Sequence, residues 1–165
     1  MDFVIRPGTE DDLPAMLRLW REMMDLHAWV EPRFRPAPAP AGEQAWEKHL
    51  RQNVWGNEGW CVFVAEVAEA DGRLIGQIMG MLRDPAPVFE PGRYGYVTDI
   101  VVDPETRYSG VGRALFEALK GWMRERGSSH LELQVAHNNP ISQAFWRAMG
   151  CTDYMNTLWC DLEAA

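Results

Sequence analysis

Hydrophobic and polar residues recur along this chain with two different periods, and the change of period predicts the order of helices and strands. Apolar residues recur every three to four positions in residues 12–26 and 110–126, which is typical of amphipathic helices. Shorter apolar runs bounded by glycine, proline or aspartate predict strands. The predicted strands are 2–6, 61–67, 74–82, 94–102, 130–136 and 153–162, and the predicted helices are 12–26, 43–53, 110–126 and 140–149.

This order predicts an α/β fold in which helices cover both faces of one mixed sheet. Asp71-Gly72 is a typical hairpin turn between two of the predicted strands. The Pro/Ala-rich residues 35–42 are predicted to form a loop, because neither flank is expected to fold alone. A chain of 165 residues fits a single domain, 1–165. The predicted core face of the first helix consists of Leu13, Met16, Leu17, Trp20, Met23 and Met24.

Composition and charge narrow the classes of protein to be considered. The net charge of −8 argues against a nucleic-acid partner, whose phosphates require a basic surface. It would favour a cationic substrate such as an amine, although the same charge also serves solubility. No apolar run approaches the roughly 20 residues that span a bilayer, so no membrane partner is expected. Three cysteines without a CxxC pair, and no basic segment before the first strand, predict a reducing cytoplasmic location.

The turn between the strand 94–102 and the helix 110–126 is the most informative stretch. Residues 107–112 read Arg-Tyr-Ser-Gly-Val-Gly. Glycines let the backbone approach a ligand closely, and the unpaired amides at a helix start favour an anion. The pattern lacks the third glycine of a dinucleotide-binding loop and the lysine of a Walker A loop. It therefore predicts a pyrophosphate-binding turn, with a purely structural glycine turn as the alternative.

Three segments together resemble the GNAT N-acetyltransferase superfamily. Residues 107–112 are similar to its Arg/Gln-x-x-Gly-x-Gly/Ala acyl-CoA pyrophosphate loop, 98–104 to its central strand and 139–146 to its second cofactor motif. The segments follow one another in the family's order over residues 95–151. The resemblance implies the GNAT fold, a mixed and mostly antiparallel sheet in a three-layer α/β/α arrangement. It also implies an enzyme that transfers an acetyl group from acetyl-CoA to a primary amine.

The resemblance assigns a cofactor site as well. Backbone groups of residues 100–102 would pair with the pantetheine arm as an added strand, and the Ile100 amide would stabilise the oxyanion. Simpler structural roles compete with this interpretation: a buried strand, a helix cap at Asn139 and core packing at Phe145. No metal is implied. The implied cofactor contacts are Ile100, Val101, Val102, Arg107, Tyr108, Ser109, Gly110, Val111, Gly112, Arg113, Asn139, Phe145 and Trp146.

Two positions depart from the family pattern, and both concern proton transfer. Many relatives carry a glutamate where this chain has Thr98, so the neighbouring Asp99 is the predicted base, with a cap or ion-pair role as the alternative. Strand alternation places Thr98 and Asp99 on opposite faces unless a bulge intervenes. Many relatives carry a tyrosine acid where this chain has Trp146, whose indole is no practical acid but would wall the thiol pocket. Tyr154 is a candidate replacement, and the acid stays unassigned.

The acceptor site is implied to lie on the first two helices and their loop. Four of the eight tryptophans fall between residues 29 and 60, and aromatic walls with carboxylates suit an organic amine. His27, Trp29 and Glu31 are the predicted acceptor-binding residues, with hydrophobic packing as the alternative. His27 and Glu31 have helical i, i+4 spacing without a third ligand, so no metal site is expected.

Three functional hypotheses follow from these residues. The first is an acetyl-CoA-dependent N-acetyltransferase acting on a small-molecule or peptide amine, with a homodimer as a candidate assembly. The second keeps the fold and changes the acyl group. The third is an acyl-CoA-binding sensor or pseudoenzyme, which the changes at Thr98 and Trp146 motivate because the predicted docking loop is intact.

Overall fold

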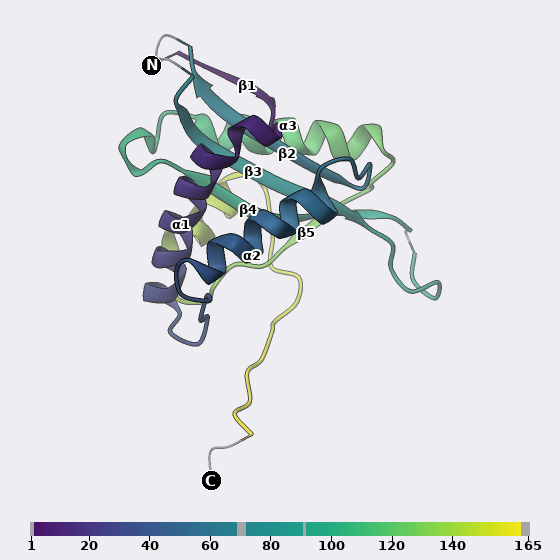
Figure 1. Ribbon diagram of the computed structural model, residues 1–165. Coiled ribbons are helices and arrows are strands. Elements are labelled where there is room, and N and C mark those ends of the chain that lie inside the picture. The colour runs from purple at the N-terminus through teal and green to yellow at the C-terminus, as the bar shows by residue number, and fades with distance from the viewer. Residues whose placement is uncertain (1, 69–71, 91, 163–165) are drawn as a thin grey trace.

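A five-stranded sheet in the order β1-β2-β3-β4-β5 forms the centre of the computed structural model, which describes residues 2–68, 72–90 and 92–162 (Figure 1). The first four strands pair antiparallel, and β5 is parallel to β4. The predicted mixed and mostly antiparallel sheet is therefore confirmed. The strands are β1 (Phe3–Pro7), β2 (Trp60–Val67), β3 (Leu74–Arg83), β4 (Tyr94–Val102) and β5 (Leu131–Leu133).

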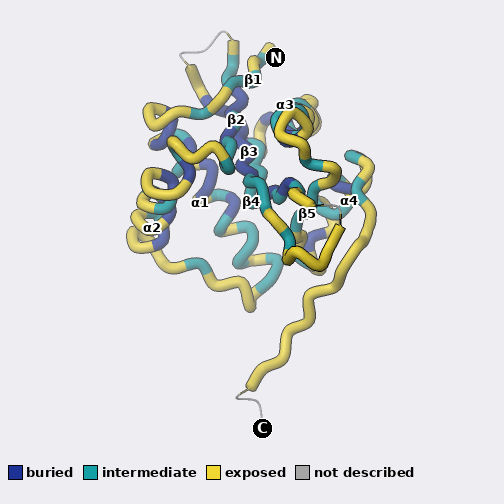
Figure 2. The backbone as a smooth tube through the Cα atoms, turned by 90° about the vertical axis from the view of Figure 1, so that its right-hand side faces the viewer, coloured by how far each residue is buried: buried dark blue, intermediate teal, exposed yellow. Residues whose placement is uncertain are grey.

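Within the described residues, α-helices cover both faces of this sheet, as Figures 1 and 2 show. They are α1 (Leu13–Val30), α2 (Ala41–His49), α3 (Val111–Glu125) and α4 (Pro140–Ala148). One buried cluster joins α1, α2 and the π-helical turn 50–54 to β2 and β3. The other joins α3 and α4 to the opposite face. The three-layer α/β/α arrangement is confirmed.

Local sequence explains where α1 begins. The Asp12 carboxylate accepts hydrogen bonds from the Thr9 amide at 2.8 Å and from both terminal nitrogens of Arg6 at 2.7 and 2.8 Å. The Arg6 guanidinium, with smaller help from Thr9, lowers the pKa of Asp12. Pro14 lies in the first turn, where its missing N–H removes no helical hydrogen bond. The helix continues to Val30, four residues beyond its predicted end.

Several predicted boundaries are corrected by the structure. The helix predicted over 43–53 begins at Ala41 and changes into the π-helical turn at Leu50. The strand predicted over 130–136 keeps only Leu131–Leu133. The strand predicted over 153–162 is wrong, because this segment pairs with no described strand and all its residues are exposed, Cys160 included. Of the predicted hairpin turn, Gly72 has a φ of +72°, and Asp71 lies outside the described residues.

Candidate functional site

A gap in the sheet opens beside the second half of β4. The pairing of β4 with β5 ends at Val97 and Leu133, whereas β4 continues to Val102. Among the described residues, the β5-side edge of residues 98–102 has no strand partner. Unpaired strand edges offer backbone donors and acceptors to an extended ligand. The predicted pantetheine-pairing residues Ile100, Val101 and Val102 all lie on this edge, half-buried.

A β-bulge lies at the start of the gap and decides the direction of Asp99. In the register with β3, Asp99 is opposite Met79 and Val97 is opposite Gly80, so Thr98 is the extra residue. The Thr98 hydroxyl donates to the Met79 carbonyl at 3.1 Å and fixes the bulge. The sequence left this arrangement open between strict alternation and a bulge, and the structure contains the bulge.

Asp99 lies on the sheet face that α1 and α2 cover. Val101, two residues along the strand, packs into the cluster under these helices, whereas Ile100 packs on the α3 side. Burial raises the pKa of Asp99 above its usual range, while the Thr98 hydroxyl and the charge of His49 act in the opposite direction. His49 ends α2, and its ring meets Trp60 edge-on at 5.4 Å. A carboxylate of raised pKa beside an imidazole suits proton transfer near neutral pH.

The 107–112 turn has the geometry of an anion-binding site. Gly110 caps α3 with a φ of +91°, and a Cβ added there would meet no atom within 4 Å. The preceding Tyr108 also has a positive φ, 65°, and its side chain is 98% exposed. Val111 is buried and anchors the turn, and Gly112 lies so close to the Phe145 ring that a Cβ would meet it at 3.1 Å. The backbone before α3 is therefore open to an approaching ligand.

The charge around this turn suits an anion. Arg107 and Arg113 are exposed, and neither forms an ion pair with any described residue. The first amides of α3 have no acceptor within the helix, and the helix dipole is positive at this end. The predicted pyrophosphate contacts, Arg107 through Arg113, are thus brought together on one exposed turn, where Ser109 donates its hydroxyl to the Thr106 carbonyl.

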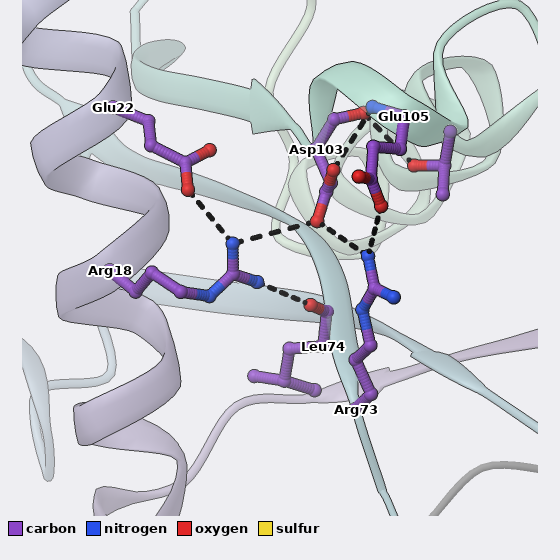
Figure 3. Close-up of polar contacts among 7 residues, drawn as sticks. Arg18, Glu22, Arg73, Leu74, Asp103 and Glu105 are labelled. Carbon is purple, nitrogen blue, oxygen red and sulfur yellow. Dashed lines mark hydrogen bonds and ion pairs between the residues drawn. The ribbon is translucent and has the colours of Figure 1, made fainter.

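Asp103 holds the start of this turn in place (Figure 3). Its carboxylate is 6% exposed and accepts from the Glu105 amide at 3.0 Å, from Arg73 at 3.0 Å and from Arg18 of α1 at 3.5 Å. Its carbonyl accepts from both the amide and the hydroxyl of Thr106. Burial alone would raise the pKa of Asp103, but the Glu105 amide and the arginines outweigh it and lower the pKa.

Residues at the start of α4 and within it pack against the 107–112 turn and the α3-side core. Asn139 is buried and caps α4, since its side-chain oxygen accepts from the Ser142 amide at 3.0 Å. Phe145 lies under Gly112 and contacts Trp146, whose ring centroid is 4.9 Å away. Trp146 is 6% exposed and also meets Phe116 edge-on at 5.2 Å, within the α3-side core. Packing therefore accounts for Trp146, and its predicted role as a wall of the thiol pocket stays a prediction.

The predicted acceptor residues are brought together only in part. His27 is half-buried with its ring 5.5 Å from Phe34, and burial lowers its pKa. Trp29 is 79% exposed and forms no enclosed wall. Glu31 is bound by both ends of the Arg33 guanidinium at 2.7 Å, and this pairing lowers the pKa of Glu31 to about 2.

Three further residues interact with candidate site residues or with the 107–112 turn and were not predicted to do so. His137, in the loop before α4, adds a small electrostatic contribution to the lowered pKa of Glu31, after the larger effects of Arg33. His49 follows the buried Trp46 by three positions, so helical periodicity from Trp46 would have placed it on the sheet-facing side. Asp103 was predicted only as the end of a strand, although Asp-Pro at that position signals a capped turn. The candidate acid Tyr154 is 78% exposed, and no described residue fixes its hydroxyl.

No helix among the described residues is long and apolar enough to cross a membrane. They likewise contain no group of three His, Cys, Asp or Glu side chains that would hold a metal ion.

Comparisons with known proteins agree with this geometry. The profile of the acetyltransferase (GNAT) family matches residues 20–151. The L-2,4-diaminobutyric acid acetyltransferase of Nocardia farcinica is 34% identical over 83 residues, which are 50% of this chain and only 40% of that enzyme.

Solved structures extend the likeness to nearly the whole chain. A mutant of the BH1408 protein from Bacillus halodurans has a TM-score of 0.80 at 20% identity, covering 96% of this chain and 99% of that one. The aminoglycoside N-acetyltransferase AAC(6')-Iy in complex with CoA has a TM-score of 0.72 at 19% identity, covering 99% of this chain and 96% of that one. At such identities these structures establish the fold.

Proposed function

The chain belongs to the acetyltransferase (GNAT) family, and from this premise we propose that it transfers an acetyl group from acetyl-CoA to a primary amine of a small molecule. The observation that carries the proposal is the continuity of the β4 edge. Among the described residues, the β5-side backbone edge of 98–102 has no strand partner, and the open Gly110 turn follows it at the start of α3. Small amines are favoured as acceptors because two relatives are named for diaminobutyrate and aminoglycosides.

The donor-binding part of the proposal uses backbone groups. The amides of residues 110–113 suit the pyrophosphate, and so do the exposed Arg107 and Arg113, because neither arginine forms an ion pair with a described residue. The pantetheine arm fits the free edge of residues 100–102 as an added strand. The thioester then lies beside Ile100, at the mouth of the gap between β4 and β5.

The chemistry is direct attack of the amine on the thioester carbonyl. An alkylammonium has a pKa of about 10.4, so it must lose one proton before attack and a second one afterwards. Asp99 takes these protons, directly or through water, and passes them to His49 and solvent. The amide of Ile100 donates to the oxyanion of the tetrahedral intermediate. Collapse breaks the carbon–sulfur bond, and a thiolate with a pKa near 8.5 leaves as the anion and is protonated by solvent.

Thiol release from acetyl-CoA tests the proposal with a panel of acceptors: a diamino acid, an aminoglycoside and a peptide with a free amino group. We expect release that depends on both protein and amine, with an acetylated amine found by mass spectrometry. Acetyl-CoA that binds without release for any amine would favour the acyl-CoA sensor. Release with propionyl- or longer acyl-CoA, but little with acetyl-CoA, would favour the acyltransferase of different acyl preference.

A further inference from the structure

A half-buried part of the sheet lies next to Asp99 on the same face. Val97 belongs to the α3-side core, so its neighbour Tyr96 points to the face that α1 and α2 cover, as Asp99 does. Tyr96 pairs with Glu132 of β5, which shares this face. Tyr96 and Glu132 are half-buried, whereas Met79, opposite Asp99, is buried under the helices. The face therefore becomes more open from Asp99 toward the start of β4, where Figure 1 shows β3 and β4 running on beyond α2.

Arg83, the last residue of β3, lies over this open part of the face. Its guanidinium carbon is 3.5 Å from the centroid of the Tyr96 ring. Stacking on a ring fixes the plane of a guanidinium and leaves the N–H groups at its edge available. Asp84 is not its partner, because both oxygens of that carboxylate accept from Arg93, at 2.9 and 3.1 Å. Within the described residues Arg83 forms neither a hydrogen bond nor an ion pair, so a half-buried cation is held in place without an anion.

Glu132 supplies the opposite charge on the other side of Tyr96. Because β3 and β5 both neighbour β4, Arg83 and Glu132 flank the tyrosine. A carboxylate oxygen of Glu132 lies 3.6 Å from Nε2 of His130, which is too long for a hydrogen bond. The side chain is 32% exposed and accepts no hydrogen bond from the described part of the chain. A cation and a carboxylate on either side of one ring match a ligand group that carries both charges.

We propose that the acceptor is a diamino acid whose α-amino-carboxylate head binds at Arg83, Tyr96 and Glu132 while its distal amine reaches Asp99. This inference rests on the proposed acetyltransferase function and names its substrate class. Arg83 binds the carboxylate, since a planar guanidinium donates two parallel hydrogen bonds to such a group. Glu132 binds the α-ammonium, and Tyr96 lies beneath the head.

The spacing along the strands sets the length of the acceptor. Met79 and Met81, the β3 partners of Asp99 and Tyr96, are two residues apart, which is about 6.8 Å along a strand. With carbon–carbon bonds of about 1.5 Å, an extended side chain of about four methylene groups spans this distance, and a side chain of about two falls short. The geometry therefore favours a long diamino acid such as lysine over a short one.

Packing is the competing role for Arg83. The stem of an arginine covers an aromatic ring well, and such a contact stabilises the open end of a hairpin. Packing does not need the charge, however, so methionine, which is unbranched and flexible, can replace the stem. The two roles therefore predict different results for Arg83→Met. Packing predicts at most a change in stability, whereas carboxylate binding predicts a loss of selectivity among acceptors.

Three acceptors of matched length test the head group in the parent protein. Lysine carries both charges, 6-aminohexanoate lacks the α-amino group, and cadaverine lacks the carboxylate. We expect kcat/KM for thiol release from acetyl-CoA to be highest for lysine and about tenfold lower for cadaverine, the factor expected for one hydrogen-bonded charge pair. Removal of the α-amino group should also lower it, and fragmentation of the product should place the acetyl group on the distal amine. Equal kcat/KM for lysine and cadaverine, or acetylation of the α-amine, would overturn the proposal.

Arg83→Met identifies the residue that reads the carboxylate. This variant should raise KM for lysine to that for cadaverine while kcat stays nearly unchanged, because the head lies away from the reacting atoms. Cadaverine should be turned over as before, and Arg83→Lys should keep part of the preference. The matched control is Arg126→Met, since the Arg126 guanidinium also stacks on a ring, 4.5 Å from the centroid of Trp122, but at the end of α3. A preference for lysine that survives Arg83→Met, or that Arg126→Met removes equally, would contradict the assignment.

Binding measured by calorimetry in the presence of CoA separates this inference from the proposed function. Lysine should bind the parent protein about tenfold more tightly than cadaverine does, and Arg83→Met should abolish the difference. This result without acetylation of any amine would contradict the proposed function and support the amino-acid site. Acetylation of all three amines with equal kcat/KM would contradict the amino-acid site alone. Neither selective binding nor acetylation would overturn both.

Discussion

The two sides of the β4 edge are built by different means. On the proposed donor side, most of the cofactor contacts lie within residues 100–113, and only Asn139, Phe145 and Trp146 come from the distant start of α4 and from α4 itself. On the proposed acceptor side, the candidate side chains come from α1 and the turn after it, from α2 and from β4, and the structure brings them together only in part. The conformation of the proposed donor site therefore depends mainly on local sequence, whereas the proposed acceptor site depends on how distant elements pack.

The two sides also differ in charge. Arg107 and Arg113 on the donor side are exposed and unpaired in the described structure, ready for an anion. On the acceptor side, Glu31 is already paired with Arg33, and burial favours the neutral form of Asp99. The net charge of −8 is thus not concentrated as free carboxylates at the proposed acceptor site. The comparison predicts that donor binding depends on backbone geometry and that turnover depends on one carboxylate.

The largest effect is expected for Asp99→Asn. If Asp99 takes the amine protons, turnover should fall by roughly 10²- to 10⁴-fold, the usual range for the loss of a general base. The affinity for acetyl-CoA should barely change, because the proposed donor contacts near residue 99 are backbone groups. In the parent protein, turnover should rise as pH increases through the raised pKa of Asp99, and this acidic limb should vanish or shift in the variant.

Stability gives the control for this variant. The folded pKa of Asp99 lies above the reference value of 3.8, so the folded state holds this proton more tightly than the unfolded state does. The free energy of unfolding therefore falls as pH rises through that interval, and the loss persists at neutral pH. Asparagine has no such proton, so Asp99→Asn should be at least as stable at pH 7. A clear loss of stability with unchanged turnover per folded molecule would assign Asp99 a structural role instead.

The next largest effect is expected for Gly110→Val. Acetyl-CoA at about 100 times its dissociation constant should stabilise the parent protein by roughly 2.7 kcal/mol. Valine at a φ of +91° strains the turn and places a side chain in the open space before α3, so this gain should disappear. Thermal unfolding with and without acetyl-CoA measures it.

Gly127→Val is the matched control, because Gly127 also has a positive φ, +81°, and no atom within 4 Å of an added Cβ. It follows α3 at the opposite end of the helix from Gly110. This variant should lose stability from backbone strain yet keep the full acetyl-CoA-dependent gain. An equal loss of acetyl-CoA-dependent stabilisation in both variants would contradict the assignment of the 107–112 turn as the pyrophosphate-binding site.

A smaller effect is expected for Asp103→Asn, which keeps the size of the side chain and removes its charge. Hydrogen bonds to a charged group contribute about 1.5–3 kcal/mol, and asparagine keeps part of them, so the free energy of unfolding should fall by less than this amount. Because the 107–112 turn is then held less firmly, acetyl-CoA should bind several-fold more weakly. The pKa of Asp103 is lowered, so its contribution is present at neutral pH and is lost as pH falls through the folded value. Acid titrations of unfolding should differ accordingly between the two proteins.

Glu105→Gln provides the comparison within the same network. Glu105 also pairs with Arg73, at 3.1 Å, but its side chain is 79% exposed. Exposed pairs contribute little, so this variant should keep both stability and acetyl-CoA affinity. Equal losses in the two variants would indicate that the charge of the network matters rather than the buried carboxylate that fixes the turn.

The conformation of the 107–112 turn could be predicted from sequence because it depends on neighbouring residues, whereas its role in donor binding stays a proposal. Gly110, the helix period that follows it and the Asp-Pro before it each impose local geometry. The Thr98 bulge could not be decided in this way, since it depends on the register with β3. The exposure of Trp29 could not be predicted either, because helical periodicity does not show how far neighbouring elements extend over the end of a helix.

The strand predicted over 153–162 is wrong for a further reason. Its strand propensity is real, but a strand forms only where another strand accepts its backbone hydrogen bonds, and no propensity identifies that partner. The same limit applies to the electrostatic effect of His137 on Glu31, because the two residues are far apart in sequence. Most of the order of elements and the conformation of the 107–112 turn could thus be predicted from local sequence, whereas features that depend on contacts between distant segments could not.

The smallest effect on activity is expected for Trp146→Phe. The indole is 6% exposed and packs edge-on against Phe116 and Phe145, so its surroundings are those of a core residue. Replacing it with a smaller ring should cost about 1–3 kcal/mol of stability, less than complete truncation to alanine does. Turnover at a temperature well below the melting transition should stay within about threefold, because a thiolate with a pKa near 8.5 leaves without an acid. Steady-state rates and thermal unfolding on one preparation measure both quantities. A loss near a thousandfold with unchanged acetyl-CoA affinity would instead show that the indole N–H acts on the reacting atoms, and the donor side would then depend on a side chain as the acceptor side does.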